Sequence, residues 1–220
     1  MGRTREFEDE AVLDRASELF WRRGYEVVTI QDLESATGLG RGSLYNAFGD
    51  KEGLFLAALD RYLAKFGSTP LRHLAERDVA KGIRLMFGAI IERMSNPANP
   101  RGCLLTNTSL AFGTGSSQID NYVAGKIKAM ELLLEEAIAR ARDEGQIPAD
   151  TDPKSLARFY CAVAQSLGVM HRALGDPAAL RTIVSVAMRS WPGEHPRTGG
   201  ATAPAGARKP RRRRRRLGAK

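Results

Sequence analysis

The 220-residue chain is poor in the side chains that most often carry catalysis or bind metals. Its two cysteines, Cys103 and Cys161, lie far apart and lack the spacing of metal ligands or of a disulfide framework. Its three histidines are isolated, no predicted helix carries paired metal ligands, and no catalytic serine or phosphate-binding glycine motif follows a strand. We therefore expect a protein that is not an enzyme and that needs neither a cofactor nor a metal.

Long apolar runs are also absent. No stretch is long enough to span a bilayer, and the first ten residues, MGRTREFEDE, alternate in charge where a signal peptide would be apolar. The sequence therefore predicts a cytoplasmic, nucleoid-associated protein with no membrane partner. No alternating pattern of β-strands competes with the helical spacing of the apolar residues, so the predicted fold class is all-α.

The excess of positive over negative charge is confined to one end of the chain. The net charge is +9, and residues 192–220 hold ten basic residues and one acid, so the rest of the chain is neutral. This terminal segment is rich in Gly, Ala and Pro, contains six consecutive arginines and is predicted to be disordered. It either adds sequence-independent affinity for DNA phosphates or is a solubilising extension. A non-specific DNA-binding protein that acts through this tail is therefore one alternative function.

Residues 29–55 carry the most specific pattern, a helix, a glycine-bracketed turn and a second short helix. Thr29, followed three positions later by Asp32, predicts a capping box at the start of the first helix. Gly38 suits the left-handed conformation that ends this helix, and Gly40 precedes a second helix predicted from Arg41 to Phe48. In a helix-turn-helix unit, the second helix lies in the major groove of DNA.

The predicted second helix divides into an apolar and a polar face. Leu44 and Phe48 face inward with Leu39, which leaves small and polar side chains facing outward. Arginine can pair with guanine and asparagine with adenine, while serine and tyrosine hydroxyls can reach bases or phosphates. The alternative is an ordinary helical hairpin whose exposed polar residues are only solvated.

The stretch from Val12 to about Phe55 resembles the TetR family of bacterial transcriptional regulators. The residues that carry the resemblance are Ala16, Leu19, Phe20, Gly24-Tyr25, Thr29-Ile30, Gly38-Leu39, Ser43-Leu44-Tyr45, Phe48 and Lys51-Glu52. The resemblance implies that residues 41–48 form the recognition helix and that Thr29, Tyr45 and Lys51 contact phosphates. The DNA-binding candidates are Thr29, Arg41, Gly42, Ser43, Tyr45, Asn46 and Lys51. Gly40 departs from the family, which often has a serine or another side-chain cap there.

The remaining chain predicts a larger helical domain. We expect about nine helices in two domains, a three-helix DNA-binding domain (1–50) and a helical ligand-binding and dimerisation domain (51–191), and these are followed by the arginine-rich tail (192–220). The last two helices, predicted at 153–174 and 177–191, carry apolar residues on more than one face. Resemblance to the TetR family implies that they form a four-helix homodimer interface, as a palindromic, double-stranded operator with two half-sites requires. A monomer that buries both faces in one core is the alternative.

The resemblance also implies a ligand cavity in the larger domain. A small-molecule effector in it would change the separation of the two DNA-contacting units and release the operator, so repression is the expected function. The candidate lining residues are Phe87, Met94, Cys103, Phe112, Phe159 and Met170. Methionine and aromatic residues at helical spacing are also typical of an ordinary core. The modest charge of the region favours an uncharged or weakly polar effector.

Residues 101–105, Arg-Gly-Cys-Leu-Leu, resemble a loop-helix junction in a branch of the family that includes regulators of responses to reactive electrophiles. A position near a helix N-terminus and two residues from Arg101 would lower the pKa of the Cys103 thiol. An electrophile- or redox-sensing repressor is therefore a second alternative function. The competing interpretation is a cysteine that only packs beneath the loop, as Cys161 is expected to do in the core.

Overall fold

A computed structural model describes residues 2–112 and 117–193, and these residues form helices and connecting turns with no strand. The predicted all-α class is confirmed. The helices are α1 (Gly2–Arg23), α2 (Ile30–Thr37), α3 (Arg41–Phe48), α4 (Lys51–Phe66), α5 (Ser68–Arg72), a short 3₁₀ helix (His73–Ala75), α6 (Val79–Ser95), α7 (Leu104–Ala111), α8 (Gln118–Asp143), α9 (Pro153–Leu174) and α10 (Pro177–Met188). Nearly all of the predicted arginine-rich tail, from residue 194 onward, lies outside the described residues.

The described residues contain ten α-helices where the sequence predicted about nine. The additional helix is α5, which occupies a segment where Gly67 and Pro70 predict a break in the helical pattern. Pro70 is the third residue of α5, and in the first turn of a helix its missing N–H leaves no hydrogen bond unmade. Gly67 keeps helical dihedrals and the Ser68 hydroxyl donates to the Ala64 carbonyl, so the chain remains helical from α4 into α5.

Polar side chains at the helix starts explain why these elements begin where they do. The Asp50 carboxylate accepts from the Gly53 N–H at the start of α4, and Asp78 accepts from Lys81 at the start of α6. Ser117 and Asp120 form a reciprocal capping box on α8. Helices α9 and α10 each follow an aspartate cap and open with a proline. Caps of this kind each contribute about 1 kcal/mol to stability and fix the register of the helix.

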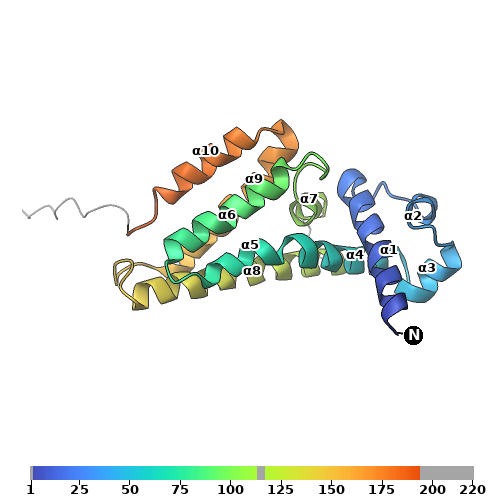
Figure 1. Cartoon of the computed structure of the whole chain (residues 1–220), viewed down its shortest axis with the longest axis horizontal. Coiled ribbons are helices and arrows are strands. Elements are labelled where there is room, and N and C mark those ends of the chain that lie inside the picture. The colour runs from blue at the N-terminus through green and yellow to red at the C-terminus, as the bar shows by residue number, and fades with distance from the viewer. Residues whose placement is uncertain (1, 113–116, 194–220) are drawn as a thin grey trace, which may run out of the picture.

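The helices surround two hydrophobic cores. In Figure 1, α1, α2 and α3 lie at one end of the molecule, and we call them the α1–α3 unit. The first core joins this unit to α4, with Phe20, Leu33, Leu44 and Phe55 at its centre. The second core joins α6, α8, α9 and α10. Helix α4 packs along α1 and leads from the first core toward the second, and the domain boundary at residue 50 stays a prediction.

Within residues 2–112 and 117–193, no helix combines the length and the apolar character that crossing a membrane requires. No three histidine, cysteine, aspartate or glutamate side chains there are grouped as metal ligands. The expectation of a protein without a cofactor stays a prediction.

Candidate functional site

The turn between α2 and α3 is built from local hydrogen bonds. The Thr29 hydroxyl accepts from the Asp32 N–H at 3.1 Å, and the Asp32 carboxylate accepts from the Thr29 N–H at 2.9 Å. Gly38 adopts a left-handed conformation with φ of 77°, and its N–H closes α2 on the Glu34 carbonyl. The predicted capping box and the predicted role of Gly38 are both confirmed. These interactions fix the direction in which the chain enters α3.

Helix α3 receives its N-terminal cap from another helix. Gly40 offers no side chain, and the Glu34 carboxylate of α2 accepts instead from the Arg41 N–H at 2.6 Å. No pattern in the sequence indicates this contact, since only the turn geometry brings residues seven positions apart together. At the other end of α3, a Cβ on Gly53 would overlap the Phe48 carbonyl oxygen, so only glycine allows α4 to pack this closely. Helix α3 is therefore held at both ends.

The outer face of α3 carries the predicted DNA-binding side chains. Leu44 is buried beneath the helix, whereas Arg41, Ser43 and Asn46 are exposed. The Arg41 guanidinium lies 5.1 Å from the centre of the half-buried Tyr45 ring. Exposed residues also include Gly42 and Thr29. Which of these residues contact DNA stays a prediction.

Lys51 follows the same surface at the first turn of α4. Its ammonium lies 4.3 Å from the centre of the Tyr25 ring, which restrains the side chain through a cation-π contact. Tyr25 in turn packs on Phe55, with ring centres 5.0 Å apart. The structure thus places Lys51 against the first core, with the charge half-exposed.

Residues 1–50 contain ten acidic and six basic residues, but several of the acids are paired with basic side chains. Asp32 pairs with Arg23 at 2.7 Å, and Asp14 pairs with Arg61 of α4 at 2.9 Å. Hydrogen bonds from the Thr29 N–H and hydroxyl and from Arg23 lower the pKa of Asp32 to about 2. Arg41, by contrast, forms no ion pair with any described residue, so its charge is available to an anion.

A cavity of about 280 Å³ lies between the middle helices, and we call it the central cavity. Its walls come from α4 to α9 and are mostly apolar, with Arg93, Lys126 and Gln165 among the polar exceptions. Two of the six predicted ligand-binding residues, Met94 and Cys103, line it. Sequence periodicity could not identify the other residues that line the cavity, since it shows which face of a helix is apolar but not which helix faces meet around a cavity.

The remaining four ligand-binding candidates lie elsewhere. Phe87 is fully buried in the second core, and Met170 packs against that core. Phe112 lines a separate cavity of about 340 Å³ beside α1 and α7. Phe159 is 42% exposed on α9. The structure therefore does not bring the six candidates together, and their role in ligand binding stays a prediction.

Cys103 sits at the start of α7, where its thiol meets two polar groups. The Arg93 guanidinium donates to the Tyr62 hydroxyl at 2.8 Å, and that hydroxyl donates to the Cys103 sulfur at 3.5 Å. Burial alone would raise the pKa of the Cys103 thiol, but the Arg93 charge, the Tyr62 hydroxyl and Thr106 outweigh it, so the pKa is lowered. Of the two causes expected from the sequence, the helix N-terminus contributes through the backbone of Thr106, whereas the Arg101 guanidinium lies beside Gly175 and is not among the groups that lower this pKa. Cys161 is buried, as predicted.

Comparison with known proteins decides the family. The family model described as "Bacterial regulatory proteins, tetR family" matches residues 12–58, and "Tetracyclin repressor-like, C-terminal domain" matches residues 80–187. The HTH-type transcriptional repressor ComR of Escherichia coli (strain K12) is 32% identical over 193 residues, covering 87% of this chain and 92% of ComR. The chain belongs to the TetR family.

Two further relatives of this TetR-family chain extend the comparison. The uncharacterised HTH-type regulator YezE of Bacillus subtilis (strain 168) is 31% identical over 190 residues, covering 86% of this chain and 98% of YezE. A cysteine mutant of the TetR-family regulator CifR, solved with 26-bp operator DNA, superimposes with a TM-score of 0.78 and 31% identity, covering 83% of this chain and 95% of that one. The protein is a DNA-binding transcriptional repressor of the TetR family, and its matched relatives are regulators, a non-enzymatic role.

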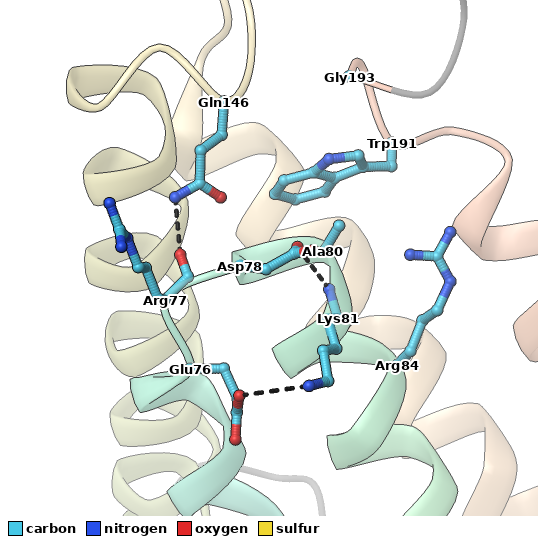
Figure 2. Close-up of a pocket in the computed structure, with 9 residues that line it drawn as sticks. All are labelled: Glu76, Arg77, Asp78, Ala80, Lys81, Arg84, Gln146, Trp191 and Gly193. Carbon is cyan, nitrogen blue, oxygen red and sulfur yellow. Dashed lines mark hydrogen bonds and ion pairs between the residues drawn. The ribbon is translucent and has the colours of Figure 1, made fainter.

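This TetR-family protein also has an open groove of about 660 Å³ beside the start of α6 (Figure 2). Its polar groups largely satisfy one another. The Gln146 amide donates to the Arg77 carbonyl at 2.7 Å, and Lys81 pairs with Glu76 at 3.9 Å, as the dashed lines in Figure 2 show. We assign no function to this groove.

Proposed function

We propose that the protein is a homodimer that represses transcription by binding a palindromic operator through α3 and releases it when an effector fills the central cavity. The observation that carries this proposal is the outer face of α3. Its polar side chains are exposed, the helix is capped at both ends, and Arg41 has no ion-pair partner among the described residues. Operator DNA bound to the similar protein CifR supports the same role here.

The side chains of α3 suit distinct parts of the duplex. We infer that Arg41 donates two hydrogen bonds to guanine O6 and N7, and that Asn46 donates to adenine N7 and accepts from the adenine N6 amino group in the major groove. Ser43 reaches a base or phosphate, and Gly42 allows the backbone to approach. Thr29, Tyr45 and Lys51 contact phosphates, which position the helix without selecting a sequence.

DNA-binding measurements test this assignment. Operator DNA from the region upstream of the coding sequence is compared with random duplex by fluorescence anisotropy at fixed salt. Arg41→Ala and Asn46→Ala should each weaken operator binding about 10- to 100-fold, because each bidentate base contact contributes about 1–3 kcal/mol. Arg77→Ala and Asn121→Ala remove the same side chains at exposed positions outside the α1–α3 unit and should bind normally. Unchanged operator binding by the α3 variants would refute the proposal.

The proposed dimer interface includes an uncharged stripe on α9. Residues Phe159, Ala162, Ser166, Val169 and Ala173 recur at intervals of three and four, and Phe159 and Val169 are 42% and 39% exposed. A stripe of this kind gains free energy when a second copy covers it. Light scattering should give a dimer mass, and Val169→Glu should shift it toward the monomer. A monomer mass for the parent protein at micromolar concentration would reject the interface.

A second candidate function is electrophile sensing through Cys103. The observation that favours it is the chain of donors from Arg93 through Tyr62 to the Cys103 sulfur, which stabilises the reactive thiolate at the wall of the central cavity. Maleimide labelling followed by mass spectrometry should modify Cys103 faster than the buried Cys161. The modified protein should release operator DNA and Cys103→Ser should not. Equal release by both proteins would remove this candidate.

The remaining proposals follow from DNA binding. Because a repressor acts on chromosomal DNA, we propose that the protein is located in the cytoplasm at the nucleoid. We also propose that it has no enzymatic activity. The arginine-rich tail lies almost wholly outside the described residues, and we keep its contribution to phosphate binding as a hypothesis. Truncation after Trp191 should reduce the salt dependence of binding if the tail contacts phosphates. Equal affinity of the full chain for operator and random duplex would instead favour a non-specific DNA-binding protein.

A further inference from the structure

The central cavity contains a cation that no acid neutralises. Arg93 lies in the last turn of α6 and is half-buried at the cavity wall. Its guanidinium makes one hydrogen bond to a side chain, to the Tyr62 hydroxyl, and forms no ion pair with any described residue. Lys126, the other cation at the wall, pairs with Asp60 at 3.0 Å. The two basic residues of the cavity are therefore not equivalent.

Arg93 is held in place by aromatic rings rather than by charge. Its guanidinium lies 5.6 Å from the Trp21 ring, 5.8 Å from the Tyr62 ring and 6.0 Å from the Phe66 ring. These contacts fix the position of the cation but do not cancel its charge. A guanidinium has five N–H donors in a planar fork that matches a carboxylate, and most of those of Arg93 have no acceptor among the described residues.

The rest of the cavity is suited to a small apolar body. Its walls include Ile90, Met94, Met130 and Ala164. A volume of about 280 Å³ is at the small end of ligand pockets. The site therefore combines a mostly apolar space with a single uncompensated positive charge. This combination selects a ligand that is apolar over most of its length and anionic at one end.

We propose that the effector of this repressor is a small amphipathic monoanion, such as a medium-chain or aryl-substituted carboxylate, whose charged end binds Arg93. The proposal rests on the proposed function, since it takes the central cavity as the effector site. It departs from the expectation of an uncharged or weakly polar effector, because the overall charge of a region does not show whether one of its cations lacks a partner.

Through Arg93, binding of an anion in the central cavity can affect the packing of the DNA-contacting helices. Trp21 belongs to α1, and its ring packs on Tyr62 and Phe66 of α4 with centres 4.9 Å and 5.6 Å apart. A carboxylate that draws Arg93 into the cavity competes with the Tyr62 hydroxyl for its N–H groups and changes the contact with Trp21. Binding is thereby linked to the packing of α1 on α4, on which the position of α3 depends.

The test uses three probes with the same chain length, octanoate, 1-octanol and octylamine, added to the full-length protein. The chain has two tryptophans, so Trp191→Phe leaves Trp21 as a fluorescent reporter beside Arg93, and calorimetry on the parent protein gives an independent affinity. Octanoate should bind at least tenfold more tightly than 1-octanol, and octylamine more weakly than either. An apolar pocket without a cation would instead prefer the alcohol.

Variants assign the preference to Arg93. Arg93→Met, which keeps a long apolar side chain, should remove the preference for octanoate while 1-octanol still binds, and Arg93→Lys should retain part of it. Arg77→Met is the matched control, since this exposed arginine lies outside the central cavity. Circular dichroism establishes that each variant is folded, and retained binding of 1-octanol shows that the cavity persists.

The outcomes separate this proposal from the proposed function. Equal or tighter binding of the alcohol by the parent, a preference that survives Arg93→Met, or no binding of any probe would each overturn the anion site. If octanoate binds through Arg93 but does not weaken operator binding, the anion site stands and effector-controlled release fails. If the α3 variants bind operator normally, the DNA-binding assignment fails whatever the probes do.

Discussion

The α1–α3 unit and the central cavity use arginine in opposite ways. Arg41 lies on the outside of α3, where water solvates its charge until DNA replaces the water. Arg93 is half-buried among three aromatic rings at an apolar wall, where an unpaired charge costs free energy. The difference teaches that the DNA-contacting surface is already prepared for its ligand, whereas the cavity gains stability when an anion enters. Effector binding should therefore raise the melting temperature.

The largest expected effect in either region comes from a buried leucine. Leu44→Ala removes the buried side chain of α3, and Leu134→Ala removes a fully buried side chain of the second core. Each should lower the free energy of unfolding by about 2–5 kcal/mol, measured by urea denaturation. Leu44 is the buried anchor of α3, so its loss should also weaken operator binding in conditions where both variants are folded. Equal operator affinities would show that α3 does not depend on this anchor.

A second comparison uses two glycines inside helices. Gly53→Ala adds a Cβ against the Phe48 carbonyl and should destabilise the protein by about 1–3 kcal/mol while displacing α3 from α4. Gly125→Ala, in α8, adds a Cβ with no atom within 4 Å and should stabilise the helix by about 0.5–1 kcal/mol. Thermal unfolding and operator anisotropy of both variants check this. Normal operator binding by Gly53→Ala would contradict the close packing described for α3 and α4.

The two capping boxes allow a finer comparison. Thr29→Ala and Ser117→Ala each remove the hydroxyl that caps a helix, α2 in the first case and α8 in the second. Each should cost about 1 kcal/mol of unfolding free energy in denaturant titrations. We expect Thr29→Ala alone to weaken operator binding, since Thr29 is also a predicted phosphate contact. The same loss of affinity in Ser117→Ala would show that reduced stability, and not a lost contact, is responsible.

The smallest expected effect is the pH dependence of two interhelical ion pairs. The hydrogen bond from Arg61 lowers the pKa of Asp14, between α1 and α4, and Lys128 and Arg158 lower that of Glu131, between α8 and α9. A carboxyl group whose pKa is lowered by folding stabilises the folded state at pH values above the ordinary pKa of that group. This contribution is lost as the pH falls below about 4. Asp14→Asn should flatten the acid side of the stability curve by at most about 1 kcal/mol. Glu131→Gln should act in the same direction, and an unchanged acid limb in either variant argues against its ion pair.

Local patterns made the α1–α3 unit the more predictable region. The capping box of Thr29, the left-handed Gly38 and the bounds of α3 follow from neighbours within a few positions, and the structure confirms them. The Glu34 cap on Arg41 was missed because it joins two helices across a turn. Helix α5 was missed because Pro70 usually marks a break, yet here it lies within a first turn.

The cavity could not be predicted in the same way, because six helices build its wall. Apolar spacing placed Met94 and Phe87 on inward faces alike, and only the packing shows that Met94 meets the cavity while Phe87 fills the core. Nothing near Arg93 in the sequence signals its three aromatic neighbours, since Trp21 is far away in the chain. Long-range packing, which no local pattern encodes, decides these positions.

Helix α4 belongs to both the DNA-contacting region and the effector site. Leu54 and Phe55 near its start support α3, while Tyr62 and Phe66 near its end line the central cavity. At 16 residues it spans about 24 Å as a single rod. Anyone who re-engineers this repressor as a biosensor for another compound therefore has unequal freedom. Residues of the cavity wall on α5, α8 and α9 can be randomised to change ligand selectivity. Those on α4 have to be kept, since altering them would disturb ligand binding and operator binding together.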